Sequence, residues 1–330
     1  LKRQLSRLAD AGMAAFVGTE LEFIVFNDTY EQAWAKGYRE LTPANQYNVD
    51  YSIIGTSRIE PLLRKIRLDM AGAGLQVESA KGECNFGQHE IAFLYEDALK
   101  TCDNHVVYKT GAKEIAAQLG YALTFMAKYN EREGNSCHIH LSFRGTDGSL
   151  VMSDEADAEN GLSDVGRTFI AGQLAHLREL SLMFAPNINS YKRFAPGSFA
   201  PTSIEWGRDN RTCALRLVGR KAGLRLENRI PGGDVNPYLA VAAMVAAGLD
   251  GIEKGLELRP AFEGNAYASD GEKTPWRLAD AVDLWEGSQW VAETFGEDVQ
   301  EHYGNMGRIE IEAFGQTVTD WERYRGFERL

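Results

Sequence analysis

Glutamates lie inside or beside several apolar runs that have the pattern of buried strands. Glu20 and Glu22 lie two apart in the run 16–26, and Glu83 and Glu90 flank a Gly-Gln turn signal between two further predicted strands. Residues i and i+2 of a strand face the same side of a sheet, and a glycine at the bend allows Glu83 and Glu90 to converge. Converging carboxylates repel unless a cation lies between them or one is protonated. The chain must therefore fold so that charge gathers around one point.

Two histidines repeat this spacing in another predicted strand. His138 and His140 lie two apart, and Glu227 lies in a further predicted strand. Carboxylates joined by imidazoles suit Mg²⁺ or Mn²⁺ better than Zn²⁺ or copper. The alternatives are that the histidines are hydrogen-bonded core residues and that some glutamates are surface charges. The position of Glu20 and Glu22 inside an apolar run argues against the second alternative.

Basic residues gather in one later part of the chain. Several of them alternate with apolar residues, and the guanidinium fork binds phosphate and carboxylate oxygens in pairs. Divalent cations together with arginines are typical of phosphoryl transfer, although a solvated basic face is the alternative. No GxxxxGK[ST] or GxGxxG loop occurs, which argues against a P-loop or Rossmann nucleotide site. The basic residues of this part are Lys192, Arg193, Arg211, Arg216, Arg225 and Arg229.

The composition excludes several partners. The formal net charge is −12 over 330 residues, which argues against non-specific nucleic-acid binding. No apolar stretch approaches the length of a membrane span and no signal peptide is visible, so we expect no membrane association. The four cysteines show no CxxC spacing, which favours free thiols and a cytoplasmic location. The chain opens with Leu1 rather than Met, so we expect that a preceding segment is missing.

The predicted elements mix strands and helices without regular βαβ alternation. Apolar residues at helical spacing predict helices over 58–73, 97–119 and 164–183, and Asn236-Pro237 opens a long apolar helix. Helical patterns in the tail span 277–285, 288–295, 296–303 and 309–321. This order predicts an α+β fold with a largely antiparallel sheet.

Six motifs, in order along the chain, resemble those of the catalytic domain of type I glutamine synthetases. The resemblance covers essentially all of residues 1–330 and implies a curved antiparallel β-sheet flanked by helices. It also implies a smaller N-terminal β-grasp domain, missing from this chain, and a homo-oligomer, in the family a dodecamer. The motifs are Glu20-Leu21-Glu22-Phe23, Gly87-Gln88-His89-Glu90, His138-Ile139-His140-Leu141-Ser142, Asn189-Ser190-Tyr191-Lys192-Arg193, Asn210-Arg211-Thr212 and Arg225-Leu226-Glu227-Asn228-Arg229.

The resemblance implies roles for individual residues, together with ATP and two or three Mg²⁺ or Mn²⁺ ions. The ligands of a first metal would be Glu22, Glu83 and Glu90, and those of a second would be Glu20, His138 and Glu227. Nucleotide contacts would come from Glu78, His140, Ser142, Arg216 and Arg225. Glutamate and amine would meet Gly134, Arg193, Phe199 and Arg229, and the arginines that act on the phosphates and the γ-carboxylate would be Arg211, Arg216 and Arg229.

The implied reaction has two steps, and two departures from the family pattern bear on its substrate. ATP would phosphorylate the γ-carboxylate of glutamate, and an amine would then displace the phosphate. Phe199 stands where the family has a flap glutamate that helps to deprotonate ammonium, and Glu133 stands in place of an asparagine. A phenyl ring cannot accept a proton, but it can pack against methylenes and contact an ammonium group. A buried loop anchor is the alternative for Phe199.

With these two departures, the sequence resembles the γ-glutamylpolyamine synthetases. The sequence therefore predicts an ATP-dependent ligase that joins glutamate to a polyamine such as putrescine, cadaverine, spermidine or spermine. One alternative is an ammonia-dependent glutamine synthetase with an altered flap. Another is a relative without activity, but such a protein would be expected to lose metal ligands that this chain retains.

Overall fold

The computed structural model describes residues 1–329, and its strands join into one sheet. The strand order is β2-β3-β1-β6-β9-β8-β7, and β4 and β5 each pair with β1 outside this path. The described strand pairs are antiparallel except β7 and β8, so the predicted α+β class and largely antiparallel sheet are confirmed. The strands are β1 (Met13–Phe26), β2 (Val77–Gly82), β3 (Gln88–Phe93), β4 (Glu96–Asp97), β5 (Ala122–Thr124), β6 (Cys137–Gly145), β7 (Trp206–Arg208), β8 (Leu215–Val218) and β9 (Arg225–Asn228).

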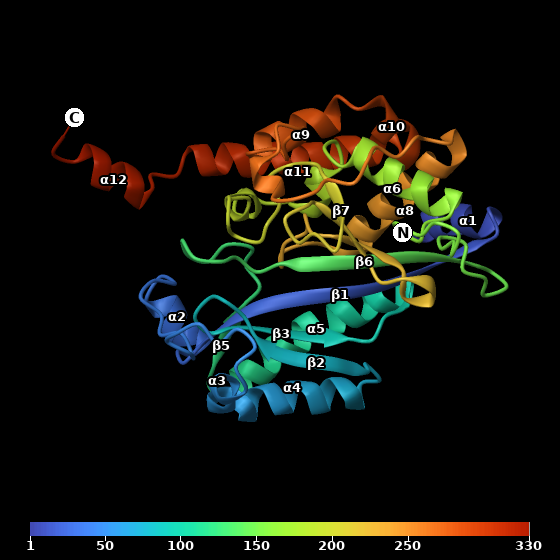
Figure 1. The fold of residues 1–330 in the computed structure, drawn as a ribbon. Coiled ribbons are helices and arrows are strands. Elements are labelled where there is room, and N and C mark those ends of the chain that lie inside the picture. Colours follow the sequence, from blue (N-terminus) through green and yellow to red (C-terminus); the bar gives the residue numbers. More distant parts are fainter. Residues whose placement is uncertain (330) are drawn as a thin grey trace.

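Helices lie on both sides of the strands. Figure 1 shows α4 and α5 beside β2 and β3, whereas α6, α8 and α9 to α11 gather beyond β6, and α12 projects away from them. No described helix is both long and apolar enough to cross a membrane. The helices are α1 (Lys2–Asp10), α2 (Tyr30–Ala35), α3 (Ile53–Thr56), α4 (Glu60–Gly72), α5 (Ala98–Gln118), α6 (Asp164–His176), α7 (Ser181–Phe184), α8 (Pro237–Lys254), α9 (Leu278–Glu286), α10 (Gln289–Phe295), α11 (Glu297–Gly315) and α12 (Asp320–Gly326), with 3₁₀ segments η1 (Ser57–Ile59), η2 (Ser190–Arg193), η3 (Lys221–Gly223) and η4 (Ala266–Ala268).

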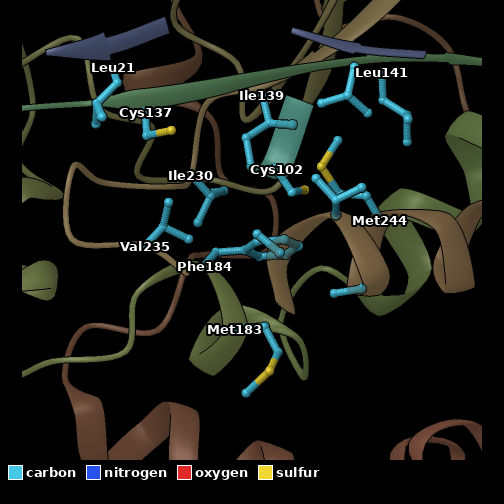
Figure 2. Packing of buried hydrophobic residues seen from close by; sticks show 14 of the residues in the cluster. Leu21, Cys102, Cys137, Ile139, Leu141, Met183, Phe184, Ile230, Val235 and Met244 are labelled. Carbon is cyan, nitrogen blue, oxygen red and sulfur yellow. The ribbon is translucent and has the colours of Figure 1, made fainter. Parts of the chain in front are cut away.

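The central strands β1 and β6 are apolar on one face and charged on the other. Leu21, Ile139 and Leu141 are at most 1% exposed, and Figure 2 shows them with Phe184 and Met244 in the hydrophobic core. The residues that alternate with them are glutamates and histidines, which therefore point to the opposite face. The apolar face holds the two strands in place through burial, so the charged face can be specialised for binding.

The register of the sheet brings the charged residues of different strands opposite one another. Side chains of directly opposed residues lie on the same face and close together. The opposed pairs are Glu22 with Glu90, Glu20 with His138, Lys81 with Glu90 and His140 with Glu227.

A tight turn between β2 and β3 brings Glu83 toward Glu90. The amide of Glu83 donates to the carbonyl of Gln88 at 2.9 Å, and Gly87 has φ +72°. A Cβ atom at Gly87 would lie 2.5 Å from the carbonyl oxygen of Val25, so only glycine fits here. The predicted convergence therefore arises from a turn between two antiparallel strands.

Helices α6 and α8 approach each other so closely that their contact is made by backbone. A Cβ on Gly251 would lie 2.1 Å from the carbonyl oxygen of Thr168 and 2.7 Å from the Cα of Gly172. Asn236 caps α8 by accepting from the amides of Tyr238 and Leu239, with Pro237 in the first turn, as the sequence predicts.

Two predicted helix boundaries are wrong. The helix expected over 164–183 ends at His176 and resumes as the short α7. The helices expected over 296–303 and 309–321 are instead one continuous helix, α11, followed by α12. Gly304 and Gly307 lie between the two expected helices and are inside α11, where a Cβ on Gly304 would meet Glu286 and one on Gly307 would meet Val282 of α9. These glycines therefore permit close packing and do not end the helix.

Substitution of Gly251 with alanine tests the close contact of α6 with α8. We expect Gly251→Ala to lower the free energy of unfolding by about 1–3 kcal/mol, because the added methyl group overlaps the backbone of α6. Urea unfolding measures this change. The control is Gly72→Ala in α4, where a Cβ meets open space and helix propensity favours alanine by up to ~1 kcal/mol. Equal stability of the two variants would contradict the packing argument.

Candidate active site

A group of three carboxylates forms the first candidate metal site. Ligand oxygens of Glu22, Glu83 and Glu90 all lie within 4.8 Å of one another. The Ser136 amide donates to Glu22 Oε2 at 2.7 Å, and the Gln88 side-chain amide donates to the same oxygen at 3.0 Å. These bonds hold Glu22 in one orientation, and the structure brings together the three residues that the sequence assigns to the first metal.

The negative charge of the first group, Glu22, Glu83 and Glu90, exceeds the positive charge of the side chain that pairs with it. Burial raises the pKa of Glu22, and burial together with the charges of Glu20 and Glu22 raises the pKa of Glu90 to about 8. The Lys81 ammonium forms an ion pair with Glu83 and lies 3.4 Å from Glu90 Oε1. A set of buried carboxylate oxygens with this charge fits a hard divalent cation such as Mg²⁺ or Mn²⁺.

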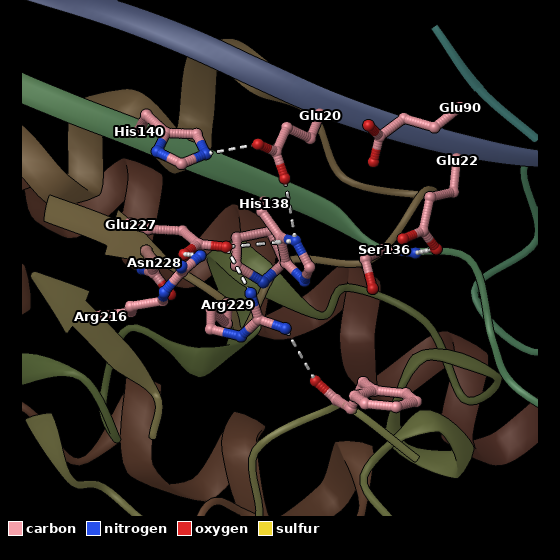
Figure 3. Close-up of polar contacts among 12 residues, drawn as sticks. Glu20, Glu22, Glu90, Ser136, His138, His140, Arg216, Glu227, Asn228 and Arg229 are labelled. Carbon is pink, nitrogen blue, oxygen red and sulfur yellow. Dashed lines mark hydrogen bonds and ion pairs between the residues drawn. The ribbon is translucent and has the colours of Figure 1, made fainter. Parts of the chain in front are cut away.

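A second group lies beside the first, around Glu20. Atoms of Glu20, His140 and Glu227 lie within 4.8 Å of one another. The ring of His138 also adjoins both carboxylates, with Nδ1 at 3.4 Å from Glu20 Oε2 and 3.3 Å from Glu227 Oε1 (Figure 3). The sequence assigns Glu20, His138 and Glu227 to the second metal, and the structure adds His140 to their neighbourhood.

The protonation of this second group also suits a cation. Burial alone would raise the pKa of Glu20, but hydrogen bonds with His138 and His140 outweigh burial and hold it well below its usual range. Burial, aided by the positive charge of Arg229, lowers the pKa of His138 to about 4. The imidazole is therefore neutral at physiological pH and keeps a lone pair that a metal can accept.

Two arginines adjoin the carboxylates, and a third lies nearby. Arg216 Nη1 donates to Glu227 Oε2 at 3.0 Å, and Arg229 forms an ion pair with the other oxygen of Glu227. The side chain of Arg211 is exposed and lines the cavity onto which these carboxylates open. Guanidinium groups at a cavity wall can bind phosphoryl and carboxylate oxygens.

Both carboxylate groups and the three arginines open onto one cavity. Its wall also contains Phe199, which is 52% exposed and has φ +60°. A phenylalanine in the left-handed region is strained, and such residues concentrate at functional sites. The exposure of the ring argues against the alternative that Phe199 is a buried anchor of its loop.

A second cavity adjoins the first, and Glu20 lines both. Apolar and aromatic groups form part of its wall, including the rings of Phe16 and Tyr95, whose centroids are 6.2 Å apart. Arg225 Nε donates to His140 Nδ1 at 3.2 Å on the same wall. Four residues that the sequence assigns to the nucleotide line this cavity together: Glu78, His140, Ser142 and Arg225. The fifth, Arg216, lines the first cavity.

The resemblance assigns Gly134 and Arg193 to the binding of glutamate. Gly134 lies in the cavity wall, whereas Arg193 is buried beneath it. Gly134 lines the first cavity, and a Cβ there would meet the Ala127 carbonyl oxygen at 2.2 Å and Arg193 Cγ at 2.9 Å. Arg193 lies beneath it, 1% exposed, and donates to the backbone carbonyls of residues 229, 230 and 231 at 2.8–3.0 Å. The guanidinium thus supports the segment that carries Arg229, and direct contact of Arg193 with glutamate stays a prediction.

Several cavity residues have no signal in the sequence that marks them as part of a site, or only a weak one. Lys81, Asp50 and Tyr51 line the first cavity, with the Lys81 ammonium 5.2 Å from the centre of the Tyr51 ring. The strand period of two offered a signal for Lys81, since it lies two residues before Glu83 and would share its face. Asp50 and Tyr51 belong to a loop that crosses the end of β2, where Gly82 leaves no room for a Cβ against the Val49 carbonyl oxygen. A contact between such distant segments has no local pattern.

Comparisons with known proteins identify the family to which the chain is similar. The family described as "Glutamine synthetase, catalytic domain" matches residues 1–325. The chain is 66% identical to "Gamma-glutamylethanolamide synthetase GlnA4" of Streptomyces coelicolor over 330 residues, which cover 100% of this chain and 71% of that protein. It is 36% identical to "Glutamate--isopropylamine ligase" of a Pseudomonas species, over 98% of this chain and 72% of that protein.

A solved structure has the same fold. "GmaS/ADP complex-Conformation 1" superimposes with a TM-score of 0.89 and 31% sequence identity, over 99% of this chain and 76% of that chain. The structure "Apo GmaS without ligand" gives the same TM-score at 30% identity, over 99% of this chain and 75% of that chain. The family match over nearly all of the chain and the two named relatives lead to one conclusion: the chain belongs to the glutamine synthetase family, which includes glutamate–amine ligases.

Proposed function

We propose that the chain is the catalytic part of an ATP-dependent ligase that joins the γ-carboxylate of glutamate to a primary amine. The observation that carries this proposal is the cavity where two carboxylate groups and three arginines meet the exposed ring of Phe199. The charged residues suit phosphoryl transfer to a carboxylate. The phenyl ring suits an alkylamine better than ammonium, because it cannot accept a proton but can pack against carbon.

In the first step the γ-carboxylate of glutamate attacks the γ-phosphorus of ATP, and ADP leaves. The second cavity suits the nucleotide, whose phosphates would reach the first cavity near Glu20, the residue that lines both. Mg²⁺ or Mn²⁺ held by the two carboxylate groups would neutralise the phosphoryl oxygens. Arg211, Arg216 and Arg229 would hold the transferring group and the γ-carboxylate in line.

In the second step the deprotonated amine nitrogen attacks the γ-carbonyl carbon, the carbon–oxygen bond to phosphate breaks, and the nitrogen gives up its extra proton to the departing phosphate or to water. The exposed rings of Phe199 and Tyr51 both line the cavity where this amine would enter. Both residues have positive φ, at +60° and +54°, so the backbone holds each ring in an unusual position. The rings would contact the alkyl part of the amine and its ammonium group before deprotonation.

We propose a short amine, with ethanolamine first among the candidates. The relative at 66% identity is named for the γ-glutamylethanolamide that it synthesises, and another is named for isopropylamine. The polyamine predicted from the sequence remains a second candidate, since a longer chain could extend toward solvent past Phe199. An ammonia-dependent enzyme is less favoured because Phe199 offers no carboxylate.

A panel of amines tests the proposed reaction directly. We expect the complete protein, including any segment that precedes Leu1 and supplied with ATP, glutamate and Mg²⁺, to release phosphate with ethanolamine and other short primary amines. We expect little release with ammonium, because the ammonium ion has no carbon to pack against the ring and Phe199 cannot accept its proton. The assay compares ethanolamine, isopropylamine, putrescine, spermine and ammonium at equal concentration. Phosphate release with ammonium alone would overturn the proposal, and release confined to polyamines would identify a polyamine as the substrate instead of a short amine.

Substitution of Phe199 tests the wall that distinguishes amines from ammonium. We expect Phe199→Glu to lower kcat/KM for the alkylamine by about tenfold, since a cation–π contact is worth about 0.5–2 kcal/mol. We also expect it to raise ammonium-dependent phosphate release, because a carboxylate can bind the ammonium ion. Phe199→Leu is the matched control, since it keeps an apolar wall without adding charge. If Phe199→Glu and Phe199→Leu have the same ratio of alkylamine to ammonium activity, residue 199 does not select the amine.

A further inference from the structure

Lys81 occupies an unusual place among the first three carboxylates. It lies on β2 directly opposite Glu90, and its side chain is 25% exposed. The ammonium nitrogen forms an ion pair with Glu83 and lies 3.4 Å from Glu90. Both carboxylates belong to the first candidate metal site, so the Lys81 ammonium already pairs with two of the three carboxylates that a metal would use.

The ammonium is the cation that bonds most directly to this group in the described part of the chain. Arg193 and Arg229 also act on Glu22 through their charge, but their hydrogen bonds go to backbone carbonyls and to Glu227. One positive charge from Lys81 faces the three carboxylates of this site. A divalent cation supplies twice the charge at the same oxygens.

A divalent ion and the Lys81 ammonium cannot share these oxygens without strong repulsion. Mg²⁺ binds oxygen at about 2.0–2.1 Å and requires lone pairs directed at the metal, and the ammonium already takes lone pairs of these carboxylates through hydrogen bonds. Lys81 has a flexible stem of four carbons, so its ammonium can move while its backbone remains in β2. The ring of Tyr51, 5.2 Å from the nitrogen, borders the space next to it.

We propose that Lys81 is an internal cation that exchanges with the first divalent metal ion. Without metal, its ammonium stabilises Glu83 and Glu90. When the metal binds, the ammonium leaves these oxygens and stays tethered in the cavity, where it is available to an anionic group of the substrates. This inference rests on the proposed function, because that function places a divalent ion among these carboxylates.

The exchange makes a prediction about metal binding that does not depend on catalysis. We expect Lys81→Gln to bind the first Mn²⁺ about tenfold more tightly than the unmodified chain, because the metal no longer displaces an ammonium; tenfold corresponds to ~1.4 kcal/mol. We also expect metal-free Lys81→Gln to have a lower Tm, since Glu83 and Glu90 lose their cation. Electron paramagnetic resonance of free Mn²⁺ measures the affinity, and thermal unfolding measures Tm.

Two control variants separate this effect from a general change in charge. Lys81→Arg keeps the positive charge and should leave the Mn²⁺ affinity within about threefold of the unmodified chain. Lys65→Gln removes a lysine whose ion pair with Asp69 is solvent-exposed, and should change neither quantity, because such pairs contribute ~0–1 kcal/mol. Mn²⁺ affinity that is unchanged or weaker in Lys81→Gln overturns the proposal.

A measurement on the unmodified chain covers the case in which Lys81→Gln does not fold. We expect Mn²⁺ to increase the rate at which acetic anhydride acetylates Lys81, because the displaced ammonium leaves its ion pair. Mass spectrometry measures this rate, and Lys65 serves as the internal reference. An acetylation rate that does not rise overturns the exchange.

Mn²⁺ binding without any dependence on residue 81 would overturn this inference alone. Absence of Mn²⁺ binding to the unmodified chain would overturn both the inference and the metal sites of the proposed function.

Discussion

Mutual repulsion among buried carboxylates is the constraint around which the site is built. Glu22 and Glu90 lie directly opposite each other on β1 and β3, although like charges in this position destabilise a sheet. The chain tolerates the pair because the other face of β1 is buried in the core, and because Lys81 supplies a positive charge nearby. In the second group, histidines and arginines around Glu20 and Glu227 reduce the same repulsion. The arrangement leaves room for more positive charge, which is what a metal-dependent phosphoryl transfer brings.

The sequence predicted the parts of this site that follow the period of a strand. Glu20, Glu22, His138 and His140 alternate with apolar residues, so their common face could be inferred before any coordinates. The turn at Gly87 was also predictable, because glycine there meets both a sequence signal and a backbone requirement. Motif resemblance extended these inferences to the distant strand β9.

Contacts between distant segments could not be predicted in the same way. The loop that carries Tyr51 reaches the cavity only because it crosses the end of β2, and the burial of Arg193 depends on the path of residues 229–231. The prediction of helix boundaries in the tail was wrong for a related reason. Gly304 and Gly307 look like helix breakers in isolation, but packing against α9 makes small residues favourable inside α11. Tertiary contacts decided each of these cases, and no local pattern reports them.

The position of Glu20 has a consequence for the way the two cavities communicate. Its carboxylate borders both, with one oxygen 2.9 Å from His140 Nε2 and the other 3.4 Å from His138 Nδ1. A ligand in either cavity that reorients this carboxylate or alters its charge also changes the field in the other. Thermodynamic linkage then requires reciprocity: if nucleotide strengthens the binding of metal by some factor, metal strengthens the binding of nucleotide by the same factor. One shared side chain would thus make the two ligands cooperative without any movement of the sheet.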